Sequence, residues 1–405
     1  MVGSKQIVLI TDNFPYGGAS ANLLRNFTLC LRNEGNDIEV ILPTGASYGK
    51  KLDQQNQSVG YFEGIKFTRL GFIYHPKNIL GKMMDNTISL FLPLIFLTKK
   101  AFNKKLDVVI VYNITAISFI PYLITKIILK KELILIISEF YQRPLNRFPL
   151  ATLKWFNFYF GIKYLSKFAD KYIVLSQFLE KYLAKKQKNS KPILVMPNLT
   201  DSSIFKIEPK KIFKENFITI GYVGTPTNKD GVFDLIESFG IINKKFPQTH
   251  LLIIGDITNG KTIVPMLEKY STERGIKKGE ITFNGLTSHK EIPSLLLSCQ
   301  ILALTRPNGI FAEAGFPTKL GEYFACKKPV VLTKVGDMKN YFIDKKEVVF
   351  AEPENIDSIV TAFEYLIKNP NEGYKIGANG YDWMNDNLNY INQSKKIDNF
   401  VKHKE

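Results

Sequence analysis

Short, unbroken runs of apolar residues recur along the chain, separated by longer segments in which apolar residues return every three or four positions. The runs are three to six residues long, are rich in Ile and Val, and show no alternation with polar positions. Strands buried on both faces of a parallel sheet have this pattern, and the intervening segments have the spacing of covering helices. Six runs lie in the first half, at Ile7–Ile10, Ile38–Leu42, Val108–Val111, Leu133–Ile137, Tyr172–Leu175 and Ile193–Met196.

The same rhythm starts again after a break near Pro197–Lys211. Six further runs follow, at Ile218–Val223, His250–Ile254, Ile281–Phe283, Ile301–Leu304, Val330–Thr333 and Val348–Phe350. Helical spacing is clear in Ala21–Glu34, Leu153–Phe168, Gly231–Asn243, Glu291–Leu297 and Lys319–Ala325. Two such series predict an α/β protein with two doubly wound, Rossmann-like domains, which we place at residues 1–203 and 204–380.

The end of the chain has a different pattern. Residues 377–405 carry apolar positions at helical spacing and no strand pattern. Two arrangements fit a helix over about 380–405: it packs back onto the first domain, or it caps its own domain. The pattern does not choose between them.

Charge is distributed unevenly between the two halves. The chain has a formal net charge of +17, of which residues 1–200 contribute +15, from 27 Lys and Arg against 12 Asp and Glu. A basic half joined to a nearly neutral half indicates contact with nucleic acid, a phospholipid surface or an anionic substrate, unless the lysines serve only solubility. The lysines have no RRM, KH or helix-turn-helix context, so no nucleic-acid partner is expected.

Cysteine use and hydropathy bear on the compartment. Three cysteines far apart, an odd number, favour a reducing environment. The run Gln6–Ile10 is too short for a secretory leader, and Val108–Leu129, the longest apolar stretch, is interrupted by Asn113, Pro121 and Lys126. We therefore expect a cytoplasmic protein, soluble or peripheral on the cytoplasmic face of the membrane.

Residues 83–105 combine an apolar segment with lysines. The run from Met83 to Leu97 is followed by four lysines, at Lys99, Lys100, Lys104 and Lys105. An apolar face beside lysines is typical of an interfacial helix on an anionic membrane surface. A core helix that ends in a solvated, basic last turn has the same pattern, so both interpretations remain open.

Two glycine-containing loops follow predicted strands and precede predicted helices. In the first domain the loop contains Gly17 and Gly18, which let the backbone come close to a ligand. The helix N-terminus that follows favours an anion. The pattern is not GxGxxG, so dinucleotide binding is not expected. In the second domain, a strand runs into a loop with candidate phosphate-binding residues Gly224, Thr225, Thr227 and Lys229.

A third motif opens a helix in the second domain. Its loop consists of Gly315, Phe316, Pro317 and Thr318, and the helix that follows carries Lys319 and Glu322. Being three residues apart, the lysine and the glutamate share one helix face near the N-terminus. Such a helix end can bind a diphosphate through its free amides and the lysine ammonium. The glutamate carboxylate can accept hydrogen bonds from sugar hydroxyls. An ordinary surface ion pair between the lysine and the glutamate has the same spacing.

Taken in order, these motifs resemble the GT-B glycosyltransferases, specifically the retaining family-four group. The segment from Phe316 to Val331 resembles that family's donor-binding helix, in which Glu322 would hold the ribose. Gly221–Gly231 resembles its phosphate loop, Pro197-Asn198 the end of its first domain, and Phe283–Gly285 the segment that contacts the base. The resemblance implies two Rossmann-like domains facing across a central cleft.

Three positions depart from the family pattern. The family's first glutamate, eight residues before Glu322, is replaced by Ala314. Its arginine is replaced by Thr225, while Lys229 stands where the family has its lysine. The amides of the Pro317-Thr318-Lys319 segment and the Lys319 ammonium, with Arg306 as a further candidate, would make up the lost positive charge. Where the family often has a histidine, this chain has Ser138-Glu139.

The resemblance implies transfer of a sugar, with retention, from a nucleotide sugar to a glycan or lipid-linked acceptor in cell-surface polysaccharide or glycolipid synthesis. It assigns catalysis to Lys229, Lys319 and Glu139. It assigns donor binding to Gly17, Gly18, Gly224, Thr225, Thr227, Lys229, Arg306, Gly315, Phe316, Pro317, Thr318, Lys319 and Glu322. No metal or other cofactor is expected, because Asp-x-Asp is absent and the four histidines lack zinc spacing. A non-catalytic scaffold or subunit of the same fold and a sugar-nucleotide epimerase are the alternatives.

Overall fold

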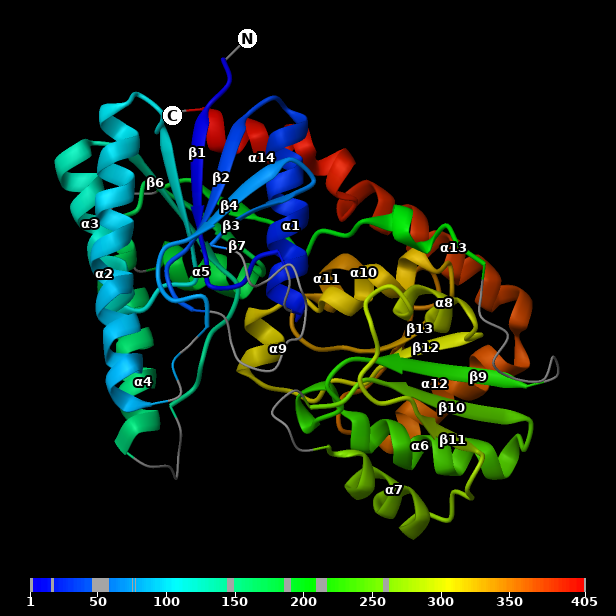
Figure 1. The fold of residues 1–405 in the computed structure, drawn as a ribbon. Helices are drawn as coiled ribbons and strands as arrows, with labels where there is room; N and C mark the ends of the chain where they lie inside the picture. The colour runs from blue at the N-terminus through cyan, green and yellow to red at the C-terminus, as the bar shows by residue number, and fades with distance from the viewer. Residues whose placement is uncertain are drawn as a thin grey trace. The chain divides into compact units, whose positions relative to one another are not determined.

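The chain forms two compact units. The computed structural model describes residues 3–15, 18–45, 58–74, 76, 78–143, 149–185, 191–208, 217–257 and 262–403. One unit consists of Met1–Leu199 together with Tyr390–Glu405, and the other of Thr200–Asn389. Figure 1 shows a central sheet with covering helices in each unit. The change from one unit to the next lies between Leu199 and Thr200, four residues before the predicted boundary.

The first unit contains an eight-stranded sheet in the order β3-β4-β2-β1-β5-β6-β7-β8. Six parallel strands coincide with the predicted apolar runs: β1 (Gln6–Ile10), β2 (Asp37–Leu42), β5 (Val108–Tyr112), β6 (Glu132–Ile137), β7 (Lys171–Val174) and β8 (Ile193–Val195). In β6, every residue from Leu133 to Ile137 is buried. Helices on both faces of the sheet explain why these strands lack alternation.

Two strands at one edge were not predicted. β3 (Val59–Phe62) and β4 (Ile65–Arg69) form an antiparallel hairpin, and β4 continues the sheet beside β2. In β4, buried positions alternate with half-buried ones, as in a strand that is partly open to solvent. Glu63 and Gly64 in the turn both have positive φ, as a two-residue hairpin turn requires. An expectation of six strands, based on continuous apolar runs, misses such a hairpin.

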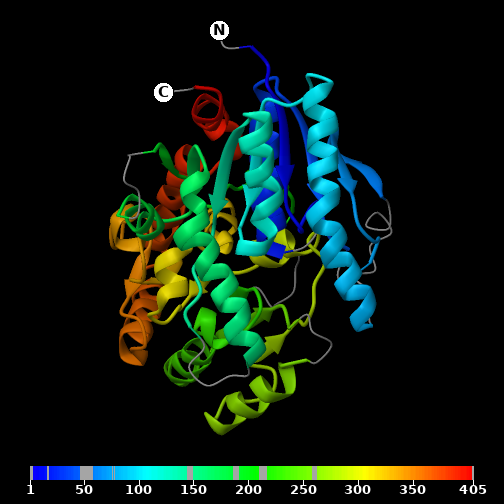
Figure 2. The same cartoon turned by 90° about the vertical axis from the view of Figure 1, so that its left-hand side faces the viewer.

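Five helices connect or cover the first sheet. They are α1 (Gly18–Asn33), α2 (Ile79–Phe102), α3 (Ala116–Leu129), α4 (Pro149–Phe160) and α5 (Gln177–Ala184). In Figures 1 and 2, α2 and α3 lie on one face of the sheet, α4 adjoins them and extends beyond the end of the sheet, and α1 lies on the other face. The predicted helix Leu153–Phe168 is regular only to Phe160, and then continues as a π-helical turn, Gly161–Leu165, and a 3₁₀ turn, Ser166–Phe168.

α2 is long and apolar. The segment Leu80–Phe102 is long enough and apolar enough to cross a membrane by length and composition alone, and 17% of its most apolar window is buried. The longest apolar stretch of the sequence, Val108–Leu129, instead divides into β5 and α3.

The last helix belongs to the first unit. α14 (Tyr390–Lys402) packs beside α1, where Ile397 and Val401 are buried and Asn36 donates a hydrogen bond to Asp398 at 2.6 Å. The preceding helix, α13 (Pro370–Asn387), stays in the second unit. Of the predicted C-terminal helix, therefore, only residues from 390 onward pack onto the first unit.

The second unit contains a six-stranded parallel sheet in the order β11-β10-β9-β12-β13-β14. Its strands are β9 (Ile218–Val223), β10 (Thr249–Ile254), β11 (Ile281–Phe283), β12 (Ile301–Leu304), β13 (Val330–Thr333) and β14 (Val349–Ala351), as the second series of runs predicts. Its further helices are α6 (Val232–Lys245), α7 (Val264–Glu273), α8 (Ile292–Leu297), α9 (Ile310–Ala314), α10 (Thr318–Ala325), α11 (Met338–Tyr341) and α12 (Ile356–Lys368).

The strand order places a switch point between β9 and β12. From β9 the chain moves outward to β10 and β11, and it then returns to form β12 on the other side of β9. Loops that leave the carboxyl ends of two such neighbouring strands diverge, and ligands of open α/β sheets bind in the crevice between them. The start and end of this unit also lie together, because the Thr200 amide donates to the Leu388 carbonyl at 2.8 Å.

The packing of α14 predicts a difference between two isoleucines of the same helix. Ile397 is 1% exposed and Ile391 is 57% exposed. Ile397→Ala leaves a cavity beneath α14 and should lower the free energy of unfolding by about 2–5 kcal/mol. Ile391→Ala should change it by less than about 1 kcal/mol, since it leaves no cavity. Urea unfolding of both variants tests this, and equal effects would contradict the packing of α14.

Candidate functional site

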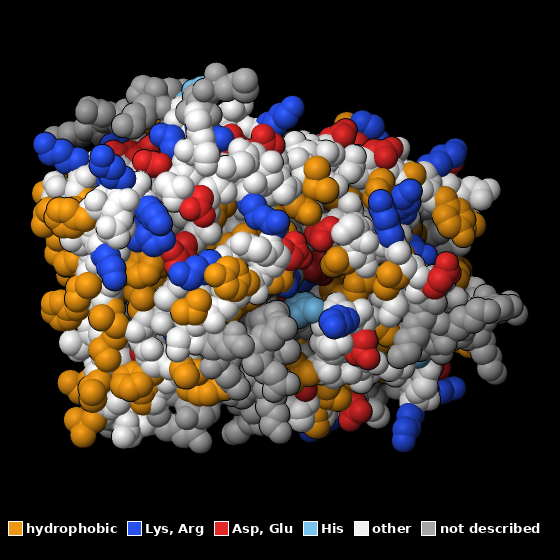
Figure 3. All heavy atoms as spheres, turned by 45° about the horizontal axis from the view of Figure 1, so that its top comes forward, with side chains coloured by type: hydrophobic (Ala, Val, Ile, Leu, Met, Phe, Trp, Pro, Cys, Tyr) orange, Lys and Arg blue, Asp and Glu red, His pale blue; other side chains and the backbone are white. Residues whose placement is uncertain are grey.

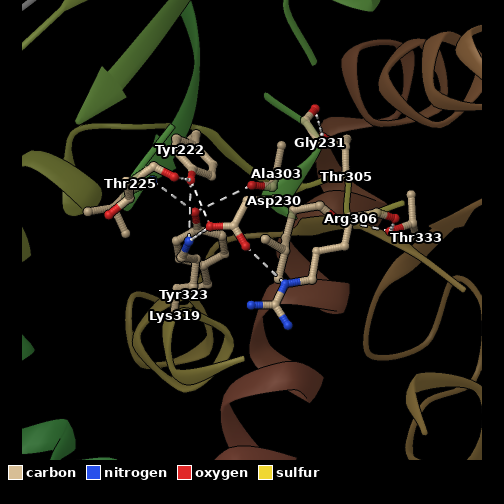
Figure 4. Close-up of polar contacts among 12 residues, drawn as sticks. Tyr222, Thr225, Asp230, Gly231, Ala303, Thr305, Arg306, Lys319, Tyr323 and Thr333 are labelled. Atoms are coloured by element: carbon tan, nitrogen blue, oxygen red, sulfur yellow. Dashed lines mark hydrogen bonds and ion pairs between the residues drawn. The ribbon is translucent and has the colours of Figure 1, made fainter. Parts of the chain in front are cut away.

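A cluster of charged and aromatic side chains lies at the switch point of the second unit. The loop after β9 contributes Asp230, the loop after β12 contributes Arg306, and the first turn of α10 contributes Lys319. Figure 4 shows the arginine and lysine side chains converging on the carboxylate of Asp230 from two different elements. Three segments far apart in the sequence therefore meet where the fold favours ligand binding.

Asp230 is the centre of this cluster. Its carboxylate accepts a hydrogen bond from Arg306 Nε at 3.0 Å and one from the Tyr222 hydroxyl at 2.9 Å, and it pairs with the Lys319 ammonium. The exposed fractions of the side chains are 8% for Asp230 and 12% for each cation. With both cations charged, the cluster holds two positive charges against one negative charge and attracts an anion.

The cluster keeps its carboxylate ionised. Burial alone would raise the pKa of Asp230, but the charges of Lys319 and Arg306 outweigh burial and lower that pKa to about 2. Burial lowers the pKa of Lys319 below its usual value, and the Asp230 carboxylate opposes this effect. Burial also raises the pKa of Tyr222, so its hydroxyl keeps its proton and can donate it.

The backbone after β9 fixes the position of Asp230. Residues Asn228–Asp230 form a single 3₁₀ turn that ends at Gly231, whose φ is +69°. A Cβ at Gly231 would collide with the carbonyl oxygen of Thr305, while the Thr305 hydroxyl donates to the Gly231 carbonyl at 2.8 Å. Only glycine combines this φ with this approach, so the glycine holds the two loops together.

Two buried tyrosines support the cluster from below. The Tyr323 hydroxyl on α10 accepts from the Val223 amide at 3.0 Å and donates to the Ala303 carbonyl at 3.3 Å. It therefore connects the helix to the ends of both β9 and β12. Tyr222 lies under the Lys319 ammonium, which is 4.8 Å from the centre of its ring.

The structure brings some predicted residues together and places others apart. Lys319 and Arg306 meet on Asp230, whereas Lys229 is exposed and its ammonium lies 5.9 Å from the centre of the Phe311 ring. The Gly224 amide, expected to face a phosphate, donates to the Ile254 carbonyl at 2.9 Å and extends the sheet. The cation that accompanies Lys319 is thus Arg306.

The loop residues Thr225 and Thr227 have backbone roles here. The carbonyl of Thr225 accepts from the Tyr222 hydroxyl at 3.0 Å, and its side chain is exposed. The amide of Thr227 donates to that same carbonyl at 2.9 Å, and its own carbonyl accepts from the Asp230 amide at 3.1 Å. These bonds shape the loop that presents Asp230.

The motif before α10 forms the entry to that helix. Pro317 precedes the first helical residue, Thr318, and among the described residues no side chain caps the helix start. The first amides of a helix have no partner within it and carry partial positive charge, which adds to the charge of Lys319. Phe316 is buried, and the centre of its ring lies 5.8 Å from the centre of the Tyr341 ring. Gly315 is half-buried.

The two glutamate positions of the family pattern differ in environment. Glu322 lies one turn after Lys319 on α10 and is half-buried. Ala314, where the family has its first glutamate, is fully buried, and Glu313 beside it is exposed. Ala314 therefore takes the place of a carboxylate, and Glu313 does not replace it inside the unit.

The remaining predicted residues belong to the first unit. Gly18 is the first residue of α1, and Gly17 lies outside the described residues. Glu139 follows β6 and accepts a hydrogen bond from the Tyr141 hydroxyl. Beside it, the Ser138 hydroxyl is hydrogen-bonded to the Tyr112 hydroxyl at 2.8 Å. Their roles stay predictions.

Sequence reasoning did not name Asp230, Tyr222 or Tyr323. Asp230 had a weak signal, since it is the acidic residue directly before the glycine of a strand-to-helix turn. The tyrosines had none, because an aromatic residue in a buried strand or helix is most often simply core. Within the described ranges, no group of three or more His, Cys, Asp or Glu side chains is arranged to hold a metal ion.

Comparison with known proteins connects the second unit with a described family. Residues 203–383 match the model of the family described as glycosyl transferases group 1. The GDP-mannose-dependent alpha-(1-6)-phosphatidylinositol monomannoside mannosyltransferase of Mycolicibacterium smegmatis is 24% identical over 166 residues, which cover 40% of this chain and 42% of that protein. The chain spans about half the length of the curated relatives it matches.

Solved structures show the fold over nearly the whole chain. Sucrose-phosphate synthase from Thermosynechococcus elongatus has a TM-score of 0.74 at 15% identity, over 97% of both chains. Anabaena HepE in complex with UDP and glucose has a TM-score of 0.69 at 18% identity, over 97% of this chain and 98% of that one. The chain has the GT-B fold, which confirms the fold class expected from the sequence.

The cluster predicts how stability responds to loss of its carboxylate. Asp230→Asn leaves two half-buried cations without their counter-charge and should lower the free energy of unfolding at pH 7 by about 3 kcal/mol. Asp382→Asn, an exposed position in the same unit, is the control and should have little effect.

The pH dependence follows from the lowered pKa. The carboxylate contributes stability that is fully present above its ordinary pKa of 3.8 and is lost as the pH falls through about 2. The difference between wild type and Asp230→Asn should therefore shrink below pH 4, as measured by chemical unfolding at a series of pH values. A difference that is independent of pH would contradict the charge pairing.

Proposed function

We propose that this protein, whose fold is GT-B and whose second unit matches the group 1 glycosyl transferases, is a glycosyltransferase that uses a nucleotide sugar as donor. The observation that carries the proposal is the pair of half-buried cations, Lys319 and Arg306, held on Asp230 at the carboxyl ends of β9 and β12. Such a site suits a diphosphate, which carries charge opposite to the excess charge of the cluster.

Lys319 and Arg306 would stabilise the diphosphate as it leaves. When the bond between the sugar and the diphosphate breaks, negative charge grows on the leaving oxygen, and cations already in place lower the energy of that state. The amides at the start of α10 would add to this stabilisation. Glu322, one turn further along, would accept hydrogen bonds from the ribose hydroxyls.

The proposed transfer proceeds with retention and without a protein nucleophile. The acceptor hydroxyl attacks the anomeric carbon on the face from which the diphosphate departs. The departing diphosphate takes the proton of that hydroxyl, so that the products are the new glycoside and a nucleoside diphosphate. Catalytic roles for Lys229 and Glu139 remain part of the proposal. The geometry described above bears only on Lys319 and Arg306.

We propose a UDP-sugar as the donor. HepE, which has the same fold, was solved with UDP and glucose, and this supports the nucleotide class. The mycobacterial relative uses GDP-mannose, so a GDP-sugar is the donor to test against it. We propose no cofactor and no metal requirement.

The proposed acceptor is a glycan or a lipid-linked sugar, in cell-surface polysaccharide or glycolipid synthesis on the cytoplasmic face of the membrane. A relative that acts on a phosphatidylinositol mannoside supports a lipid-linked acceptor. A relative named for capsular polysaccharide biosynthesis supports a surface polysaccharide.

A non-catalytic scaffold is the second candidate. Two observations favour it: the buried Ala314 in place of the family's glutamate, and Thr225 in place of its arginine. A scaffold would release no nucleoside diphosphate from any nucleotide sugar, with or without acceptor, whereas a transferase would hydrolyse its donor slowly.

The nucleotide can be identified by thermal shift. A ligand at one hundred times its Kd stabilises a protein by about 2.7 kcal/mol, which for a unit of this size raises Tm by about 5–10 °C. Among UDP, GDP, ADP and dTDP we expect UDP to produce this shift and UDP-glucose to be hydrolysed slowly. A larger shift with GDP would reassign the donor, and none with any of them would overturn the proposal.

Lys319→Gln tests the chemistry. Removing one preorganised charge donor should reduce kcat for donor hydrolysis or transfer about 10²–10³-fold, with the fold retained in circular dichroism. Lys339→Ala, an exposed lysine of the same unit, is the control and should keep full activity. Lys229→Ala should reduce kcat less than Lys319→Gln does, because a solvated cation stabilises the charge on the leaving diphosphate less than a shielded cation does. Full activity of Lys319→Gln would contradict the mechanism.

A further inference from the structure

Three helices of the first unit expose apolar stripes to solvent. On α2 the large exposed side chains include Leu80, Met84, Phe91, Ile95 and Phe102. Their spacings of three, four or seven residues, or multiples of them, keep them on one side of the helix. A helix of a soluble protein normally turns such a stripe toward the core, whereas here the stripe faces outward.

α3 and α4 repeat this arrangement. On α3 the exposed residues are Ile117, Ile120, Ile127 and Ile128. On α4 and the turns that continue it they are Leu153, Phe156, Phe160, Tyr164 and Phe168. The fourteen side chains named on the three helices are half of the 28 exposed large hydrophobic side chains of the described residues. Scattered exposed apolar residues need no explanation, but contiguous ones mark an interaction surface.

The three stripes belong to one surface. α2 packs beside α3, and the Ile117 amide at the start of α3 donates to the Asn157 side chain of α4 at 3.0 Å. Figure 2 shows α2 and α3 side by side on one face of the first sheet, with α4 adjoining the start of α3 and extending beyond it. Figure 3 shows hydrophobic side chains gathered along the same side, with lysines and arginines among them. We call this the three-helix surface.

The three-helix surface is also strongly basic. Residues 79–168 hold 13 Lys and Arg against 4 Asp and Glu, so they carry +9 of the chain's +17. Exposed lysines on or next to the helices are Lys82, Lys99, Lys104, Lys105, Lys130, Lys154 and Lys167. Some reach over the apolar rings themselves, with the Lys163 ammonium 5.1 Å from the centre of the Tyr164 ring. Apolar side chains with lysines around them match the boundary between acyl chains and anionic headgroups.

We propose that the three-helix surface docks the protein onto an anionic lipid leaflet. The apolar stripes enter the headgroup region, and the surrounding lysines meet the lipid phosphates. The sequence left an interfacial helix within residues 83–105 as one of two interpretations, whereas the structure adds the exposed apolar side chains of α3 and α4 to those of α2.

The contacts of α2 favour docking over spanning. Asp85 of α2 is fully buried and accepts hydrogen bonds from the amides of Gly45, at 3.1 Å, and Phe72, at 3.4 Å. Lys100 pairs with Glu39 of β2. These bonds fasten both ends of α2 to the folded unit. A second copy is also a poor occupant, because a symmetric contact would place two lysine-rich surfaces against each other.

Vesicle sedimentation with the full chain tests the proposal. We expect binding to vesicles that contain one quarter phosphatidylglycerol or phosphatidylserine, at least tenfold weaker binding to pure phosphatidylcholine, and release at high salt. One variant for each helix, Ile95→Glu, Ile128→Glu and Phe156→Glu, should weaken binding at least tenfold. Ile343→Glu, equally exposed but in the second unit, should change it less than twofold.

The outcomes separate the alternatives. Unchanged binding in the α3 and α4 variants, or equal binding to neutral vesicles, would overturn the proposal. Resistance to salt and to alkaline washing would indicate that α2 spans the bilayer, and a dimer in light scattering that these variants abolish would assign the surface to a second copy. Thermal unfolding checks that each variant folds. UDP binding by the variants should be unchanged, so failure to dock is distinct from failure of the proposed enzymatic function.

Discussion

The second unit is organised around one buried carboxylate. Asp230 holds Lys319 and Arg306, which would otherwise repel each other, in a fixed position at the ends of two neighbouring strands. The carboxylate offsets one of the two positive charges, and the positive charge that remains attracts an anion. The close contact of Gly231 with Thr305 and the hydrogen bonds of Tyr323 hold the loops and the helix that carry these three side chains in place. A site assembled in advance does not have to reorganise when negative charge develops, which is the property on which electrostatic catalysis depends.

Sequence patterns were sufficient for the two parallel sheets and insufficient for their edges and their site. Continuous apolar runs such as Leu133–Ile137 identify strands covered on both faces, because burial on both sides removes alternation. The hairpin β3–β4 lies at an edge, where only one residue in two is buried, and it gave no such run. Lys319 and Arg306 were named as candidates, but their common partner Asp230 lies 89 and 76 residues away from them, respectively, in sequence. Spacing within a motif does not reveal which distant loops meet at a strand switch point.

The two units use charge in different ways. The second unit has nearly equal numbers of positive and negative side chains, and three of them form a cluster of defined geometry around the buried Asp230. In the proposed function these few groups act on one ligand. In the first unit the excess of lysine is spread over solvated positions around exposed apolar side chains. Solvated charges act at a distance and are screened by salt, so they suit an extended anionic surface. Net charge alone, which was visible in the sequence, does not distinguish these two uses.

The course of the chain through α14 has a consequence for biosynthesis. The second unit is an insertion between β8 and α14 of the first, and its entry and exit are joined by the hydrogen bond from Thr200 to Leu388. On the ribosome, the first unit emerges early but lacks the helix that covers α1 until the whole insertion has been translated. During that interval the apolar side of α1 that α14 will cover is open to water or to a chaperone, while the inserted unit, being continuous in sequence, can fold completely. The part of the protein made first is therefore the last to be finished.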